Sequence, residues 1–272
     1  MNETRPYAEV IGDPIAQSKS PLIHKFWLEK LGISADYRAC HVRPEKLADY
    51  LADRQRDDAW QGCNVTIPYK LSVMDHVEDP GDLKQGIGAM NTIARTKDGS
   101  LFGTNTDAGG FFAPIADVPL EGKEVVVIGA GGAARAVLFA LSKAAVGSVT
   151  IVNRNVLKAS ALLMHFGLKG RAIAHGESLP PAALLVNSSS LGMTGQEPLA
   201  IDLQGLPQDA LVYDLVYAPL ETELLKAARA QGLETMDGMS MLIGQAALAF
   251  EIFFDAVPPL EHDEELRKLL LS

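Results

Sequence analysis

The sequence predicts an α/β protein with two domains, because short apolar runs alternate with helix-like stretches along its 272 residues. At about 150 residues per domain, this length suits two ordinary domains. A turn-rich segment, 119–123, comes before a second series of elements that opens with the run 124–128. Val and Ile on both faces of that run are typical of a strand buried inside a parallel sheet.

The N-terminal half has the alternation of βαβ units. Strands are expected at 8–11, 37–42 and 63–67, and helices at 21–31 and 44–51. Ser20 followed by Pro21 fits a helix start with serine as the N-cap and proline at the first helical position. A Lys-Asp-Gly turn between the extended runs 90–94 and 100–104 predicts a β-hairpin. A connecting helix is expected over 107–115.

The second half repeats the alternation after the glycine-rich segment that follows residue 128. Further strands are expected at 148–152, 171–174, 183–187 and 210–215, with helices ending at Leu141 and covering 157–166. A long helical pattern over 239–254 ends before Pro258, and a short charged helix is expected behind it.

Composition argues against several classes of protein. Lys and Arg number 24 against 34 Asp and Glu, so the net charge of -10 has the wrong sign for binding nucleic-acid phosphates. No run of roughly 18 apolar residues occurs, which argues against a membrane span. The first residues show no signal pattern and there are only two cysteines, so a cytoplasmic protein with free thiols is expected. His24, His41 and His76 lack the spacing of metal ligands, so no metal site is predicted.

The segment 129–134 matches the dinucleotide fingerprint in its G-x-G-x-x-A form, directly between a predicted strand and a predicted helix. Gly129 permits the tight turn, Gly131 lets the backbone approach a pyrophosphate, and Ala134 allows close packing of helix on strand. The alternative is a glycine-rich turn without a ligand. The order of strand, loop, helix and second strand favours nucleotide binding.

The end of the second strand of this unit favours NADP over NAD. An NAD enzyme usually carries Asp or Glu there to hold the ribose hydroxyl, whereas this chain has Asn153, Arg154 and Asn155. A guanidinium can stack on adenine and bind a 2'-phosphate, and Lys158 adds a second positive charge one turn later. The alternative is that Arg154 and Lys158 are merely a solvated surface pair.

Polar residues gather where the strands of the first domain are expected to end, which is where open α/β sheets bind ligands. The segments are 18–21, 64–70, 88–92 and 105–107. Each has an ordinary structural explanation as a helix cap, a turn or a strand face, but the set together favours a binding site. An oxidoreductase needs a positioned proton donor or acceptor, and Lys70 with Asp107 is the obvious pair.

The sequence closely resembles the shikimate dehydrogenase family over nearly its whole length. The motifs that carry the resemblance are GDPI at 12–15, SKSP at 18–21, NVTIPYK at 64–70, GAMNT at 88–92, GTNTD at 103–107, GAGGAA at 129–134, NR at 153–154 and GQA at 244–246. The resemblance implies NADP-linked, reversible reduction of 3-dehydroshikimate to shikimate. It also implies an open α/β substrate domain, 1–107 completed by the C-terminal helices at 238–272, around a Rossmann domain at 108–237.

The resemblance also implies roles for individual residues. Lys70 and Asp107 match the catalytic pair. The implied binders of the substrate carboxylate are Ser18, Ser20, Thr66 and Tyr217, and those of the ring hydroxyls are Asn64, Asn91 and Gln245. The implied cofactor residues are Gly129, Ala130, Gly131, Gly132 and Ala133 in the loop, Asn153, Arg154, Asn155 and Lys158 around the adenosine phosphate, and Gly238 near the nicotinamide.

Departures from the family pattern keep alternatives open. NADP-linked members usually have Thr where this chain has Asn155, so NAD remains possible as cofactor. Family members that act on quinate or other cyclohexene acids share the architecture. A nonenzymatic NADP-binding sensor is a remote alternative, which the presence of Lys70 and Asp107 disfavours. Both a monomer and a homodimer fit the sequence, and the expected partner is a small molecule rather than nucleic acid or membrane.

Overall fold

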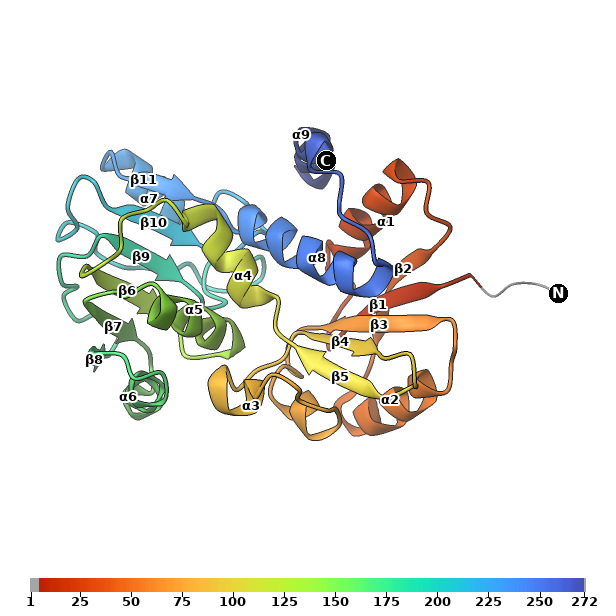
Figure 1. Cartoon of the computed structure of the whole chain (residues 1–272). Helices are drawn as coiled ribbons and strands as arrows, with labels where there is room; N and C mark the ends of the chain where they lie inside the picture. The colour runs from red at the N-terminus through yellow and green to blue at the C-terminus, as the bar shows by residue number, and fades with distance from the viewer. Residues whose placement is uncertain (1–4, 272) are drawn as a thin grey trace. The chain divides into compact units, whose positions relative to one another are not determined.

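The computed structural model describes residues 5–271 and divides into two compact units (Figure 1). The first unit runs to Thr106 and resumes at Ile243, and the second spans Asp107–Leu242. Asp107 and residues 238–242, which the sequence places in the substrate domain, therefore group with the second unit. No helix within residues 5–271 is long and apolar enough to cross a membrane.

The first unit is built on a five-stranded sheet with the order β2-β1-β3-β4-β5. Its strands are β1 (Tyr7–Gly12), β2 (Asp36–His41), β3 (Trp60–Val65), β4 (Thr92–Arg95) and β5 (Leu101–Thr104). β1 runs parallel to both of its neighbours, and every residue of it is buried. β4 and β5 are antiparallel, which confirms the predicted hairpin.

Helices of this unit pack around the sheet and against one another. They are α1 (Ser20–Lys30), α2 (Leu47–Gln55), the short α3 (Leu83–Gly86), α9 (Asp263–Leu271) and the part of α8 (Gly238–Phe254) that follows Ile243. Leu47 and Leu51 of α2 pack with Tyr7 and Ile11 of β1.

Ser20 does not cap α1, and that prediction is wrong. The helix begins at Ser20 itself, its N-cap is Lys19, and no side chain caps it. The Ser20 N–H itself donates to the Ser18 Oγ at 3.3 Å.

The second unit contains a six-stranded sheet with the order β11-β10-β9-β6-β7-β8, in which all neighbours are parallel. Its strands are β6 (Glu124–Ile128), β7 (Ser148–Val152), β8 (Gly170–Ile173), β9 (Leu184–Asn187), β10 (Leu211–Asp214) and β11 (Glu234–Met236). Its helices are α4 (Asp107–Phe112), α5 (Gly132–Lys143), α6 (Val156–His165), α7 (Glu223–Ala230) and the start of α8.

Alternate residues of β6 enter different hydrophobic cores, so this sheet is buried on both faces. Val125 and Val127 pack into a cluster with residues of α4, α5 and α6. Val126 and Ile128 pack into another cluster with residues of α7. This arrangement confirms the predicted doubly covered parallel sheet, because a strand with helices on both sides needs apolar residues at every position.

The order in which strands are added to this parallel sheet changes after β8, because β9 pairs with β6 on the side away from β7. The carboxyl ends of β6 and β9 therefore form a topological switch point, where loops leave toward opposite faces of the sheet. In open α/β sheets such a point is the usual place for a ligand.

Candidate functional site

The glycine loop lies at the switch point, between β6 and α5. Gly129 has a φ of +104°, and a Cβ added there would lie 3.1 Å from the Ser189 nitrogen. A Cβ on Gly131 would meet nothing within 4 Å, so the backbone there is open to a ligand. The Gly129 turn therefore requires glycine for its conformation, and Gly131 leaves room for close approach.

The start of α5 suits an anion. Gly131 is its N-cap, no side chain caps the helix, and its first turn contains no acidic residue. The first N–H groups of a helix have no partner within the helix, and the helix dipole favours negative charge at this end. The loop residues Ala130, Gly132 and Ala133 surround this helix start, so the donor set fits the pyrophosphate of a dinucleotide.

The four residues predicted to bind the adenosine phosphate lie together after β7. Asn153 donates from Nδ2 to the Asn155 carbonyl at 2.9 Å. Asn155 is the N-cap of α6, and its Oδ1 accepts from the Lys158 N–H at 3.0 Å. Arg154 and Lys158 are both exposed. The side-chain oxygen of Asn155 is therefore engaged in capping, which leaves its amide nitrogen as the donor for a phosphate.

Gly238 lies at the start of α8, close to the loop that follows β10. A Cβ added there would lie 2.4 Å from the Leu215 carbonyl oxygen and 2.6 Å from that of Val216. The glycine is therefore needed because the backbone of this loop occupies the space of a side chain.

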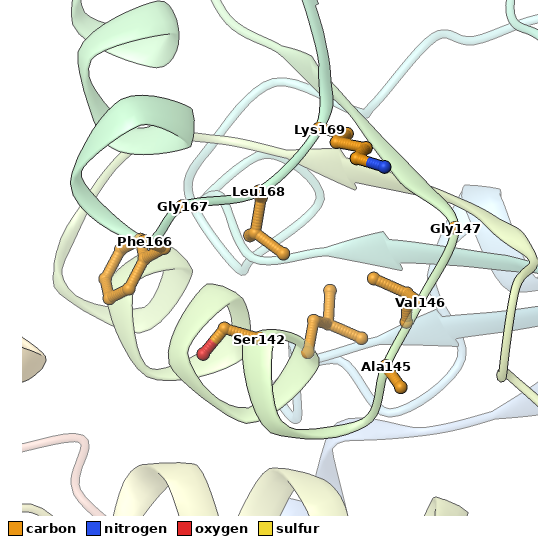
Figure 2. A pocket seen from close by; sticks show the side chains of 9 residues that line it. Ser142, Ala145, Val146, Gly147, Phe166, Gly167, Leu168 and Lys169 are labelled. Atoms are coloured by element: carbon orange, nitrogen blue, oxygen red, sulfur yellow. The ribbon is translucent and has the colours of Figure 1, made fainter.

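A pocket of about 270 Å³ lies in the second unit, at the end of the six-stranded sheet opposite to the glycine loop (Figure 2). It is lined by Leu141, Ser142, Ala145, Val146, Gly147, Phe166, Gly167, Leu168 and Lys169. These residues come before β7 and β8, at the amino ends of the strands. None of the predicted site residues lies there.

In the first unit, a buried network of polar side chains joins β3, β4, the loop after β5 and α8. The Asn64 Nδ2 donates to Thr92 Oγ1 at 3.0 Å, and the Asn91 Nδ2 donates to Thr106 Oγ1 at 2.9 Å. Gln245 Oε1 lies 3.5 Å from the same Asn91 nitrogen. The structure thus brings together the three residues predicted to bind ring hydroxyls, Asn64, Asn91 and Gln245. Each of them is buried.

Tyr37 fixes one member of this network. Its hydroxyl donates to Asn64 Oδ1 at 2.6 Å, and its ring stacks on that of His24, with the ring centroids 3.9 Å apart. Because Asn64 accepts through oxygen and donates through nitrogen, its amide can adopt only one orientation in this network.

The residues predicted to bind a carboxylate follow three strands. Ser18 and Ser20 come after β1, Thr66 comes directly after β3, and Tyr217 comes after β10. Ile11 of β1 pairs with Val65 of β3, and the Thr66 N–H donates to the Ile11 carbonyl at 3.0 Å. Ser18 and Thr66 are half-buried, while Ser20 is buried. Tyr217 belongs to the second unit, and burial raises the pKa of its hydroxyl.

Lys70 and Asp107 occupy different units of the fold. Lys70 is half-buried in the turn after β3, and its carbonyl accepts from the Met90 N–H at 2.8 Å. Asp107 is buried, with an exposed fraction of 4%, and it is the first residue of α4 in the second unit. The pairing of the two side chains stays a prediction. Within residues 5–271, no group of three His, Cys, Asp or Glu side chains could hold a metal ion.

Models of known families match three parts of the chain. The shikimate dehydrogenase substrate binding domain matches residues 10–93, shikimate / quinate 5-dehydrogenase matches 114–179, and the shikimate 5'-dehydrogenase C-terminal domain matches 238–266. A protein of Sphingopyxis alaskensis named shikimate dehydrogenase (NADP(+)) is 64% identical, over 98% of this chain and 97% of its own. The chain belongs to the shikimate dehydrogenase family.

Solved structures agree with this assignment. Shikimate 5-dehydrogenase from Thermus thermophilus, in complex with NADP(H) and shikimate, is 36% identical with a TM-score of 0.86, covering 98% of this chain and 100% of that one. Quinate dehydrogenase from Corynebacterium glutamicum, in complex with NAD, is 30% identical with a TM-score of 0.87, covering 97% and 99%. Members of the shikimate dehydrogenase family with nearly the same fold thus differ in substrate and in cofactor.

The polar network of the first unit contains three residues that were not among the predicted site residues, Tyr37, Thr92 and Thr106. Thr92 and Thr106 lie inside the polar segments that the sequence singles out, so their position was a usable signal. Tyr37 lies near the start of β2, between Asp36 and Arg38 and outside those polar segments. Its contact with Asn64 depends on strand order, which the sequence pattern alone does not specify.

Proposed function

We propose that this chain catalyses the reversible, NADP-dependent reduction of 3-dehydroshikimate to shikimate. The observation that carries the proposal is the 64% identity over 98% of the chain to a relative named shikimate dehydrogenase (NADP(+)). The uncapped start of α5 and the open backbone at Gly131 support dinucleotide binding. The buried amides of Asn64, Asn91 and Gln245 support binding of a compact polyhydroxylated acid.

In the proposed reaction, bound NADPH supplies a hydride to the ring carbonyl carbon. Lys70 donates a proton to the carbonyl oxygen as negative charge develops there, so the ketone becomes an alcohol. In the opposite direction the same lysine accepts the proton from the hydroxyl. Asp107 holds the Lys70 ammonium in position and accepts a hydrogen bond from the substrate.

The binding residues divide by the chemistry of the substrate. Hydroxyls of Ser18, Ser20, Thr66 and Tyr217 donate to the carboxylate. Side-chain amides can both donate and accept, which suits the ring hydroxyls, so these are assigned to Asn64, Asn91 and Gln245.

The cofactor residues divide in the same way. The loop of Gly129, Ala130, Gly131, Gly132 and Ala133 receives the pyrophosphate. Asn153, Arg154, Asn155 and Lys158 hold the 2'-phosphate, and Gly238 leaves space for the nicotinamide.

A second candidate is a quinate dehydrogenase that uses NAD. The similarity to the Corynebacterium glutamicum enzyme and the presence of Asn155 favour it. Steady-state assays of nicotinamide reduction, with shikimate or quinate and NADP or NAD, separate the candidates. We expect the highest kcat/KM for shikimate with NADP, and a higher value for quinate with NAD would overturn the proposal.

The two thiols, at Cys40 and Cys63, are free, which suits the reducing cytoplasm.

A further inference from the structure

A buried carboxylate lies at the end of β10, outside the residues that the proposed function uses. Asp214 is the last residue of this strand and pairs in register with Asn187, the last residue of β9. Both have an exposed fraction of 0%. Because parallel strands end at the same edge of the sheet, they lie on the side of the switch point and the glycine loop.

Three neutral groups donate to the Asp214 carboxylate. Thr222 Oγ1 donates at 2.6 Å, Asn187 Nδ2 at 2.9 Å and the Val216 N–H at 3.0 Å. Burial raises the pKa of this carboxyl above its ordinary value. A carboxylate held only by neutral donors is expensive to bury, so its presence calls for an explanation other than stability.

Asp214 is one of the groups that determine which way the Asn187 amide points. A carboxylate can only accept, so the amide must present its nitrogen to Asp214 and its oxygen to the other side. That oxygen accepts from the Ser189 N–H at 3.1 Å and from Ser189 Oγ at 2.7 Å. The same nitrogen also donates to the Leu191 carbonyl at 3.0 Å. The orientation of Asn187 thus holds both ends of the segment 189–191.

Ser188 and Ser189 support the turn at Gly129. The Ser188 N–H and Oγ both donate to the Ile128 carbonyl, at 2.9 and 2.7 Å. The Ser189 nitrogen lies against Gly129 so closely that a Cβ there would be only 3.1 Å away. A rotation of the Asn187 amide would therefore shift the backbone against which the nucleotide-binding turn is packed.

We propose that Asp214 is a positioning residue for the dinucleotide, acting through Asn187 on residues 188–191 and, through them, on the turn at Gly129. The inference rests on the proposed function to the extent that the dinucleotide binds this loop. Thr222 takes part because it donates to Asp214 and also caps α7, where its Oγ1 accepts from the Leu225 N–H.

A matched pair of substitutions tests the proposal. Thr222→Val removes a buried hydroxyl that donates to Asp214 at 2.6 Å. Thr150→Val removes a buried hydroxyl of the same sheet that donates to Glu124 Oε1 at 2.7 Å, near the first residue of β6 and away from the glycine loop. Each variant loses one hydrogen bond to a carboxylate, but Thr222→Val also loses the N-cap of α7 and should lose more thermal stability, so ligand binding is compared where every variant is folded.

The measurement is the Kd for NADP of the full-length protein, by calorimetric titration well below the Tm of every variant. We expect Thr222→Val to raise this Kd about tenfold, Asp214→Asn to raise it at least as much, and Thr222→Ser to restore it. Thr150→Val should leave it unchanged, and the KM for shikimate should stay unchanged in all variants. Equal Kd values for Thr222→Val and Thr150→Val would overturn the positioning role while leaving the proposed function intact. Failure of the wild-type protein to bind either NADP or NAD would overturn both.

Discussion

Lys70 is the residue on which the proposed chemistry depends most directly. We expect Lys70→Ala to lower kcat by about 10² to 10⁴-fold, since that is the usual contribution of a general acid or base. The KM for shikimate should rise only modestly, because binding is spread over many polar contacts. Steady-state kinetics provide the test, with Lys97→Ala, an exposed lysine of the hairpin turn, as the control. A Lys70→Ala enzyme with nearly normal kcat would rule out the assigned role.

Arg154 decides the cofactor preference in the proposed site. We expect Arg154→Ala to raise the KM for NADP by roughly 10 to 150-fold while leaving that for NAD nearly unchanged, because NAD has no 2'-phosphate to lose. The effect should shrink with added salt, since exposed charges are screened over about 10 Å at 0.1 M. Kinetics with both cofactors at two ionic strengths measure it. Arg171→Ala, at an exposed arginine of β8, is the control, and equal losses for NAD and NADP would contradict the assignment.

Asn155 shows how a residue's local role can differ from the role suggested by its position in a motif. At the sequence level its amide stands where a phosphate-binding threonine is expected. In the fold its oxygen caps α6 through the Lys158 N–H. Asn and Thr are both favoured N-caps, so the capping requirement alone accounts for either residue at this position. The exchange is therefore weaker evidence for NAD than the sequence suggests.

At the scale of secondary structure, α1 contains a histidine that cannot charge without cost. His24 is fully buried, and neither ring nitrogen has a hydrogen-bond partner among the described residues. Its ring stacks on that of Tyr37 in β2, and the centroid of the Phe250 ring in α8 is 5.8 Å away. Burial lowers its pKa to about 3 from an ordinary value of 6.5. The neutral imidazole is therefore part of the core that joins α1 to the sheet.

This histidine should make the fold acid-sensitive. Its folded pKa lies below its unfolded one, so the unfolded chain binds more protons as pH falls from 6.5 toward 3, and stability is lost over that window. At about 1.4 kcal/mol per pH unit, the loss at about pH 4.5 is about 2 to 3 kcal/mol. Urea unfolding at neutral and acidic pH should show that His24→Phe removes this part of the slope. His76→Gln, at an exposed histidine, should retain it, and an unchanged slope in His24→Phe would refute the argument.

Most strands and helices were predictable from the sequence, but α7 (Glu223–Ala230) and β11 (Glu234–Met236) were not. β6 and β7 match their expected ranges because both are rich in Val and Ile, as strands buried inside a parallel sheet are. No helix or strand was expected at the residues of α7 or β11. The signals were present, since Thr222 is an N-cap and Gly232 follows the helix with a φ of +77°. An eight-residue helix and a three-residue edge strand carry too few buried positions to stand out by pattern.

The candidate site was predictable to the extent that it depends on motifs. Asn64, Asn91 and Gln245 meet in the structure as the resemblance implies. Asp214 and Tyr37 were not predictable, because the strand order had not been determined. Asp214 acts on Asn187 in the adjacent strand β9, whereas Tyr37 of β2 reaches Asn64 of β3 across β1, which lies between the two strands. A long-range contact of this kind leaves no mark on the local sequence.

For the whole molecule, the division into two units predicts how the two ligands act. The residues assigned to the dinucleotide all lie within Asp107–Leu242, whereas the buried amides assigned to the substrate belong to the first unit. Either ligand stabilises the part of the chain that binds it. At about 100 times its Kd, a ligand contributes roughly 2.7 kcal/mol, which corresponds to about 100-fold slower amide exchange where opening requires its release.

Hydrogen exchange followed by mass spectrometry measures this separation in the intact protein. With NADP alone, we expect slower exchange at the start of α5, where the first N–H groups lack a side-chain cap, and in the segment 187–191. Shikimate alone should slow exchange of the backbone amides in peptides that contain Asn64, Asn91 and Gln245, because these segments could open only after the ligand is released. Peptides of α9, where no ligand residue is assigned, are the internal control. Protection of the same peptides by both ligands would contradict the assignment of cofactor and substrate to separate units.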